Sequence, residues 1–201
     1  MYSTRTGLVL GFHGCDASIA TEVLNGKSFL KKSENTYDWL GHGVYFWENN
    51  NSRALDFSEN LKSNPQRSKT IIQNPGVIGA VIDLGHCLDL LDHDNIQLLK
   101  LSYKFLKENL TVLPINKRLG GLQDLILRDL DCAVIEILHG LNEFDGKPSF
   151  DSVRAVFTEG EEIYEGAGFR EKDHIQICIR NPNCIKGFFL PRALDNNYSK
   201  V

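Results

Sequence analysis

The stretch from Asp38 to Glu48, Asp-Trp-Leu-Gly-His-Gly-Val-Tyr-Phe-Trp-Glu, decides how the fold of this chain is predicted. Its large aromatic residues surround two glycines, Gly41 and Gly43. Glycine permits positive φ or the close approach of another group to the backbone, whereas β-branched and aromatic residues favour strands. The stretch therefore predicts a turn that leads into a short buried strand over 44–47. Taken alone, it also fits a plain hairpin corner with an aromatic core.

An apolar segment upstream ends on a histidine. The run from Thr6 to Phe12 has the composition of a strand, and His13 and Gly14 follow it directly. A histidine at the end of a strand and beside a glycine can face a ligand. The alternative is a histidine that is hydrogen-bonded within the core or a turn.

Taken together, these segments resemble the catalytic core of the ADP-ribosyltransferases of the poly(ADP-ribose) polymerase and diphtheria-toxin type. The resemblance rests on His13-Gly14, on Gly43-Val44-Tyr45-Phe46 about thirty residues later, and on a helix that opens with Asn51-Ser52-Arg53-Ala54. It covers residues 7–190. It implies an α+β fold in which two packed, mainly antiparallel sheets form a cleft for NAD, which is the co-substrate of the family.

The composition indicates one domain over residues 1–201, because 201 residues of which 42% are hydrophobic suffice for a single core. The net charge is −4 and charges of both signs are interspersed, so we expect no strongly basic surface for nucleic acid. The sequence has no apolar run of about 18 residues and no charged-then-apolar start. We therefore expect a cytoplasmic protein without a membrane span.

The spacing of cysteines and histidines argues against disulfides and metals. The five cysteines form no Cys-x-x-Cys pair, and each lies in or beside an apolar run, as small buried residues do in a reducing compartment. The six histidines form no His-Glu-x-x-His motif and no Cys/His pairing. We therefore expect no metal site.

Hydrophobic periodicity predicts the elements around these motifs. Asp16 and the asparagines at 49–51 are expected to begin helices. The expected helices are 16–24, 51–63, 94–110 and 122–138, the last two within a helical insertion at about 88–141. The expected strands after the first two are 75–84, 150–157, 175–179 and 184–190.

The resemblance implies roles for individual residues. His13 is expected to hydrogen-bond a ribose hydroxyl of NAD, and the backbone of Gly14 is expected to bind the carboxamide. Tyr45 is expected to stack on the cationic nicotinamide ring, an interaction worth about 0.5–2 kcal/mol. Phe57 lies one residue from the position at which the family often has a second aromatic against the nicotinamide. Arg154 is a candidate for the pyrophosphate, because guanidinium suits phosphate geometry; a solvated arginine is the alternative.

The third catalytic position departs from the family. The resemblance puts Gln176 where a glutamate normally stands, so the catalytic set reads His13, Tyr45 and Gln176. Glutamine can accept a hydrogen bond from a ribose hydroxyl, but it cannot carry the negative charge that stabilises an oxocarbenium-like ribose. Relatives without the glutamate often transfer a single ADP-ribose unit or are inactive.

Other groups are candidates to replace that charge. Glu159, Glu161 and Glu162 lie in a polar loop just before the strand of Gln176, in the region where family members have a target-recognition loop. A solvated acidic loop is the alternative reading of these three residues. The acceptor or the substrate itself is another source of the base. His174 is a weaker candidate, on the same strand face as Gln176.

These inferences lead to three readings of function. The first is an NAD-dependent mono-ADP-ribosyltransferase with a macromolecular acceptor, protein or nucleic acid; a small molecule is also open as acceptor. By analogy it is a toxin or phage-defence effector with a neutralising antitoxin partner. The second is a non-catalytic NAD or ADP-ribose binding module. The third, an RNA 2′-phosphotransferase, rests on His13 and Arg154 alone, and the acidic net charge argues against it.

Overall fold

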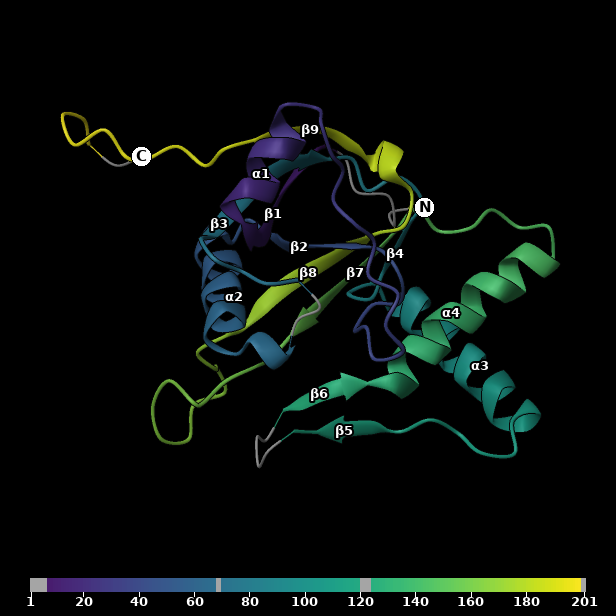
Figure 1. The fold of residues 1–201 in the computed structure, drawn as a ribbon. Helices are drawn as coiled ribbons and strands as arrows, with labels where there is room; N and C mark the ends of the chain where they lie inside the picture. The colour runs from purple at the N-terminus through teal and green to yellow at the C-terminus, as the bar shows by residue number, and fades with distance from the viewer. Residues whose placement is uncertain (1–6, 68–69, 120–123, 200–201) are drawn as a thin grey trace.

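A seven-stranded sheet forms the centre of the molecule (Figure 1). The computed structural model describes residues 7–67, 70–119 and 124–199. The strand order is β4-β7-β8-β2-β1-β3-β9, and neighbours are antiparallel except for β4 and β7. The strands are β1 (Val9–Asp16), β2 (Val44–Glu48), β3 (Pro75–Ile82), β4 (Cys87–Asp89), β7 (Ser152–Phe157), β8 (His174–Ile179) and β9 (Ile185–Phe189).

Helices and a small second sheet surround the large sheet. Within the described residues the α-helices are α1 (Ala17–Leu24), α2 (Asn51–Ser63), α3 (His93–Asn109) and α4 (Asp129–Phe144). The second sheet pairs β5 (Asn116–Arg118) with β6 (Leu125–Arg128), and short 3-10 turns cover Pro65–Arg67 and Pro182–Cys184. Helices α1 and α2 pack against β1 and β3, whereas α3, α4 and the β5–β6 hairpin lie at the other end of the large sheet (Figure 1).

The architecture is mixed α and β with a large, mostly antiparallel sheet, as the sequence predicts. Within the described residues, the strands do not form the expected pair of packed sheets. Strands from both halves of the chain hydrogen-bond into one continuous sheet, and the separate β5–β6 sheet belongs to the insertion. The sheet is nevertheless narrow between β1 and β2, where the described ladder consists of two residue pairs, Gly11 with Glu48 and Phe12 with Trp47.

A histidine side chain marks the point at which β1 and β2 separate. The Asn49 N–H donates to the Leu10 carbonyl of β1 at 2.9 Å. Backbone groups of every second residue in a strand point to the same side, so the Tyr45 carbonyl, four residues before Asn49, also faces β1. The Nδ1 of His13 lies 2.8 Å from that carbonyl oxygen. An imidazole of β1 thus bonds the carbonyl that a continued ladder would use, and the two strands diverge beyond it.

The two faces of the sheet follow from the alternation of side chains along each strand. Tyr45 and Trp47 of β2 point to one face, which we call the Trp47 face. Val44 and Phe46 point to the other, the Phe46 face. The core of the Trp47 face contains Leu40, Leu88, Ile135, Leu138, Phe150, Val153, Ala155, Phe157 and Cys178. The core of the Phe46 face contains Val44, Phe46, Ala80, Ile82, Leu84, Ile177, Ile179 and Cys184.

Both glycines of the aromatic stretch are required by their surroundings. Gly41 has φ +73°, and a Cβ there would collide with the Glu136 carboxylate. A Cβ on Gly43 would lie 2.5 Å from the Cys178 sulfur. The predicted turn leading into a buried strand is therefore confirmed, with the strand at Val44–Glu48.

The predicted helix starts are confirmed by their capping bonds. The Asp16 carboxylate accepts the Ser18 N–H at 2.9 Å and the backbone N–H groups of Gln73 and Asn74. These bonds hold the pKa of Asp16 well below its ordinary value. The Asn50 side chain caps α2 by accepting the Arg53 N–H at 3.0 Å.

The insertion differs from its prediction in the second half. Helix α3 agrees with the expected 94–110. The expected helix over 122–138 is wrong at its start, because 125–128 form strand β6 and α4 begins at Asp129. The Asn116 side chain of β5 accepts the N–H groups of Leu130 and Asp131, so the hairpin itself caps α4. Residues 120–123, which include the start of the expected 122–138 helix, lie outside the described residues.

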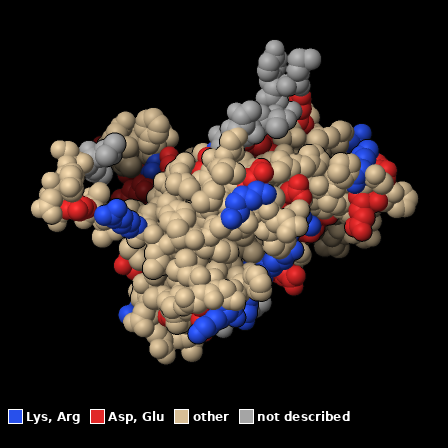
Figure 2. All heavy atoms as spheres, turned by 90° about the horizontal axis from the view of Figure 1, so that it is seen from above, with Lys and Arg blue, Asp and Glu red and all other residues tan. Residues whose placement is uncertain are grey.

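The surface carries charges of both signs. On the face shown in Figure 2, basic and acidic side chains are interspersed among uncharged ones and form no continuous basic patch. In the part of the chain that the structure describes, no helix combines the length and apolarity needed to cross a bilayer. The five cysteines are free thiols, four of them buried.

Arg154 lies in a buried ion cluster and not at a phosphate site. Its side chain is 2% exposed on the Phe46 face. The guanidinium donates to both oxygens of Glu48, on β2, and to both oxygens of Asp89, on β4 at 3.1 Å. The predicted contact with a pyrophosphate is therefore wrong, because these two carboxylates already use the guanidinium. The 2′-phosphotransferase reading loses one of its two supporting residues.

We expect Arg154→Met to lower the free energy of unfolding by about 3–5 kcal/mol, because it leaves two buried carboxylates without their cation. Urea unfolding at pH 7 measures this loss. The matched control is Arg192→Met at an exposed arginine, which should change stability by less than about 0.5 kcal/mol. Equal effects of the two substitutions would contradict the structural role of the cluster.

His139 is a buried histidine of α4 with no hydrogen-bond partner among the described residues. The residue is 5% exposed, and both ring nitrogens are buried without a partner. Burial, with the Arg180 charge nearby, lowers its pKa to about 4. The folded protein therefore keeps this ring neutral over a pH range in which the unfolded chain protonates it.

The lowered pKa of His139 predicts a pH-dependent loss of stability. Between pH 6.5 and about 4 the unfolded state binds a proton here that the folded state does not, so this histidine destabilises the fold as pH falls, by up to about 3 kcal/mol. We expect His139→Leu to be more stable than the parent at pH 5, with a smaller difference at pH 7.5. Urea unfolding at both pH values measures this; parallel pH profiles would contradict it.

Candidate functional site

A cluster of aromatic and polar side chains lies on the Trp47 face, where β2, β8 and β7 adjoin the start of α2. Trp47 is directly opposite Gln176 in the sheet. His174, two residues before Gln176, points to the same face and is paired with Phe157 of β7. We call this group the polar–aromatic cluster; it consists of Trp39, Trp47, Arg53, Phe57, Arg128, Phe157, Glu159, His174 and Gln176.

The aromatic members form walls suited to a flat ligand. The Trp47 and Phe57 ring centroids are 4.9 Å apart, and those of Trp39 and Phe157 are 4.8 Å apart. The Arg128 guanidinium, from the base of the β5–β6 hairpin, lies 4.3 Å from the centroid of Trp39 and 4.7 Å from that of Phe157. The insertion thus supplies part of the cluster.

Four buried polar atoms of the cluster have no hydrogen-bond partner among the described residues. They are Nε1 of Trp47, Nε of Arg53, Nε2 of His174 and Oε1 of Gln176. Buried polar atoms are almost always paired, since each unpaired one costs about 1–3 kcal/mol. Their concentration on one sheet face is the property expected of a site that is completed by a ligand.

The hydrogen bonds of His174 define its tautomer. Its Nδ1 lies 2.6 Å from the Lys172 carbonyl oxygen, which can only accept, so Nδ1 carries the proton. Burial lowers the pKa of His174 and keeps the ring neutral near pH 7. The unpaired Nε2 is therefore an acceptor. The cluster offers two acceptors, on His174 and Gln176, and two N–H donors, on Trp47 and Arg53.

A carboxylate and a guanidinium lie at one side of the cluster. Oε2 of Glu159 accepts from Nη2 of Arg53 at 2.8 Å and lies 3.7 Å from Nδ1 of His174. Arg53 also donates to Asp56 at 2.8 Å, and its guanidinium is 5.7 Å from the centroid of Trp47. Glu159 is thus drawn into the cluster, unlike the other carboxylates of its loop.

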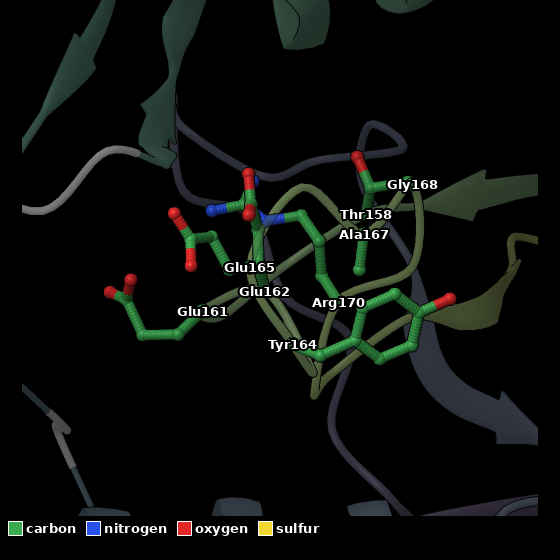
Figure 3. A pocket seen from close by; sticks show the side chains of 8 residues that line it. All are labelled: Thr158, Glu161, Glu162, Tyr164, Glu165, Ala167, Gly168 and Arg170. Atoms are coloured by element: carbon green, nitrogen blue, oxygen red, sulfur yellow. The ribbon is translucent and has the colours of Figure 1, made fainter.

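Glu161 and Glu162 line a separate, open cavity of about 510 Å³ in the loop between β7 and β8 (Figure 3). Both residues are exposed, and the Glu161 carboxylate points away from the Tyr164 ring on the far side of the cavity. The one basic residue of this lining, Arg170, donates to Asp124 at 2.8 Å. Neither glutamate belongs to the polar–aromatic cluster.

Tyr45 is fixed by its hydroxyl. The hydroxyl accepts the Leu40 N–H at 2.8 Å and donates to the Gly41 carbonyl at 2.7 Å. Burial raises the pKa of Tyr45 well above its ordinary value, so the phenol stays neutral. Tyr45 is paired with Cys178 of β8, so the two side chains point to the same face of the sheet. Gln176 is two residues before Cys178 and therefore points to that face as well. The structure brings these two predicted residues to the same side of the sheet.

His13 and Gly14 lie at the gap between β1 and β2, and the His13 side chain is not on that face. Phe12 shares the face of Trp47, so His13 points to the opposite one, where its ring is 5.8 Å from that of Phe46. It meets Tyr45 through the backbone carbonyl and not through the ring. A Cβ on Gly14 would collide with the Ala54 carbonyl, so this glycine allows α2 to approach β1.

Sequence reasoning missed two of the cluster's cations. Arg53 was grouped with the start of a helix, and its partner Glu159 is 106 residues away. Arg128 lies within a span that was predicted to be helical. The sequence does contain a signal for Glu159: it is two residues after Phe157, the last residue of β7, so an extended chain puts both side chains on one face. In the described residues, no three His, Cys, Asp or Glu side chains gather as metal ligands would.

Comparison with known proteins gives one informative similarity. The chain is 27% identical over 194 aligned residues to an uncharacterised protein of Methanocaldococcus jannaschii, an alignment that covers 87% of this chain and 83% of that protein. No protein-family model matches the chain, and no solved structure matches it. The similarity extends over nearly the whole domain and carries no statement of activity.

We expect Gln176→Met to leave the free energy of unfolding unchanged or to raise it by about 1–3 kcal/mol, because the substitution removes a buried oxygen that has no partner. Thermal and urea unfolding without ligand measure this. If the substitution instead lowers stability by more than about 1 kcal/mol, Gln176 serves the fold and not a ligand.

Proposed function

We propose that the protein is an NAD-dependent mono-ADP-ribosyltransferase that binds NAD at the polar–aromatic cluster and transfers ADP-ribose to a macromolecular acceptor, protein or nucleic acid. The observation that carries the proposal is the set of four buried donors and acceptors without partners on the face that Gln176 and Tyr45 share. The resemblance of His13-Gly14 and Gly43–Phe46 to the family supports the same reading.

The chemistry of NAD matches the groups on offer. Ribose hydroxyls both donate and accept, so one diol can satisfy acceptors such as His174 Nε2 and Gln176 Oε1 together with a neighbouring N–H donor. The nicotinamide ring is flat and cationic and suits a wall such as Trp47 with Phe57.

In the proposed reaction, NAD is cleaved at its nicotinamide glycosidic bond and the ADP-ribose group is transferred to the acceptor. Orientation of the nicotinamide ribose and stabilisation of its developing positive charge are the two tasks of the site. By analogy with small transferases, the biological role is that of a toxin or defence effector with a neutralising partner. We propose that the protein acts in the cytoplasm, where NAD is available.

A second candidate is a binding module that holds NAD or ADP-ribose without cleaving it. The observation that favours it is Gln176, which is neutral at the position where the family has a carboxylate. Binding without release of nicotinamide, unchanged by Gln176→Glu, is the result expected of such a module.

The decisive experiment measures nicotinamide release from NAD by the purified protein, with labelled NAD and cell lysate as a pooled acceptor. We expect release and labelling of lysate macromolecules. Because Tyr45 supports the turn at 40–41, a Tyr45→Ala variant would confound folding with activity. Phe57 is the better target, since it contacts Trp47 and is 36% exposed.

Phe57→Ala should weaken NAD binding by about tenfold, the loss expected for one stacking partner. The matched control is Leu55→Ala, because Leu55 lies on the same helix with the same 36% exposure. Both tryptophans of the chain belong to the cluster, so quenching of intrinsic fluorescence reports binding there. Equal affinities of the two variants would show that NAD does not bind at the cluster. If the parent protein does not bind NAD at all, the proposed function is wrong.

A further inference from the structure

Glu159 continues the row of side chains that forms the polar–aromatic cluster. The β7–β8 pairing ends at Phe157 with His174, but the Lys172 N–H still donates to the Glu159 carbonyl at 2.9 Å. The strand geometry therefore persists for two more residues. Glu159 points to the same face as Phe157 and so to the same face as Gln176.

The contacts of Glu159 engage one of its two carboxylate oxygens, Oε2. Its side chain is 13% exposed, and both its contacts, to Arg53 and His174, use Oε2. In the described part of the chain, Oε1 has no contact of this kind. The Arg53 guanidinium donates to Oε2 at 2.8 Å and fixes the position of the carboxylate. Glu159 thus offers a carboxylate held on the Nδ1 side of the His174 ring, whose Nε2 is unpaired.

The loop offers no equivalent alternative. Glu161 and Glu162 are exposed and line the open cavity on the loop. A charge in bulk solvent acts weakly, because water screens it, whereas a partly buried charge acts at short range through a lower dielectric. Of the three glutamates of this stretch, Glu159 has the position from which a carboxylate can act on a ligand in the cluster.

We propose that Glu159 is the catalytic carboxylate of this site, in place of the glutamate that Gln176 replaces, and that Arg53 is a positioning residue that holds it. The inference rests on the proposed function. Gln176 then keeps the hydrogen-bonding task of the family's glutamate, and Glu159 supplies its charge.

The reaction balances with this assignment. The bond between ribose C1′ and the nicotinamide nitrogen breaks, and its electron pair stays on the nitrogen, so that nicotinamide leaves neutral. A bond forms between C1′ and a nucleophilic oxygen or nitrogen of the acceptor, or of water. The proton of that nucleophile passes to the Glu159 carboxylate and from there to solvent. The carboxylate also stabilises the positive charge that C1′ carries between the two events.

The test compares Glu159→Gln with Glu161→Gln, two isosteric changes on one loop. Each variant is assayed for the rate of nicotinamide release at saturating NAD, for NAD affinity by tryptophan fluorescence, and for melting temperature. We expect Glu159→Gln to lower the rate at least a hundredfold and to change affinity less than about threefold. Glu161→Gln should stay within about twofold of the parent in both.

Arg53→Gln provides the second variant. It removes the hydrogen bond that holds the Glu159 carboxylate, so we expect about a tenfold lower rate at saturating NAD and a shifted pH profile of that rate. NAD affinity should also fall, because the substitution removes one of the two unpaired N–H donors of the cluster. A residue that served the fold alone would alter the melting temperature without shifting that profile.

The outcomes separate this inference from the proposed function. If the parent protein releases nicotinamide and Glu159→Gln releases it equally fast, the assignment of Glu159 is overturned and the transferase stands. If the parent binds NAD but releases no nicotinamide, the transferase itself fails and the assignment with it. Loss of rate in Glu159→Gln with affinity and melting temperature retained supports the assignment.

Discussion

The salt-bridge cluster of Arg154 with Glu48 and Asp89 is the constraint on which the rest of this structure depends. It ties β7 to β4 and, across the width of β8, to β2. Because a strand exposes alternate side chains on its two faces, holding these residues on the Phe46 face also determines which residues face the other way. A slip of one residue in β2 would exchange Trp47 for Glu48 on the face of the cluster. The polar–aromatic cluster on the Trp47 face is thus positioned by a buried ion cluster on the opposite face of the sheet.

The polar–aromatic cluster has the opposite character, since its polar atoms are incompletely satisfied. Natural folds leave few buried donors and acceptors unpaired, and those that persist concentrate where function requires them. Here they lie among rings and guanidinium groups supplied by β2, β8, α2 and the inserted hairpin. Each unpaired buried atom costs stability in the free protein, and a ligand that paired with these atoms would stabilise the fold. His13 does not belong to the cluster, because its ring lies on the other face of the sheet, against Phe46.

Much of the fold was predictable from local patterns, and the site only in part. The glycines at 41 and 43, the Asp16 cap and the periodicity of α2 and α3 each have a local physical cause, and the structure agrees with all of them. The run Leu125-Ile126-Leu127 does not distinguish the two structures, because a short apolar run fits a strand and a helix alike. Asn116 of the neighbouring strand caps α4 at Leu130 and Asp131, so the helix begins after this run. The true partners of Arg154 and Arg53 could not be read from the sequence, since Glu48 and Glu159 are each 106 residues away from them. Sequence reasoning puts His13, Tyr45 and Gln176 at one site, whereas the structure has the side chains of Tyr45 and Gln176 on one face of the sheet and that of His13 on the other. The sequence alone leaves the choice among three glutamates open.

The narrow seam between β1 and β2 has a consequence for how the chain folds. On one side of it lie β1, β3 and β9, and on the other β2, β8, β7 and β4. These two groups are interleaved along the sequence, because β2 lies between β1 and β3, and β9 follows β8. Neither group is a continuous piece of chain: the group of β1, β3 and β9 is incomplete until β9 is present, and the group of β2, β4, β7 and β8 is incomplete until β8 is present. We therefore expect slow, highly cooperative folding dominated by long-range contacts, and no autonomous fragment on either side of the seam.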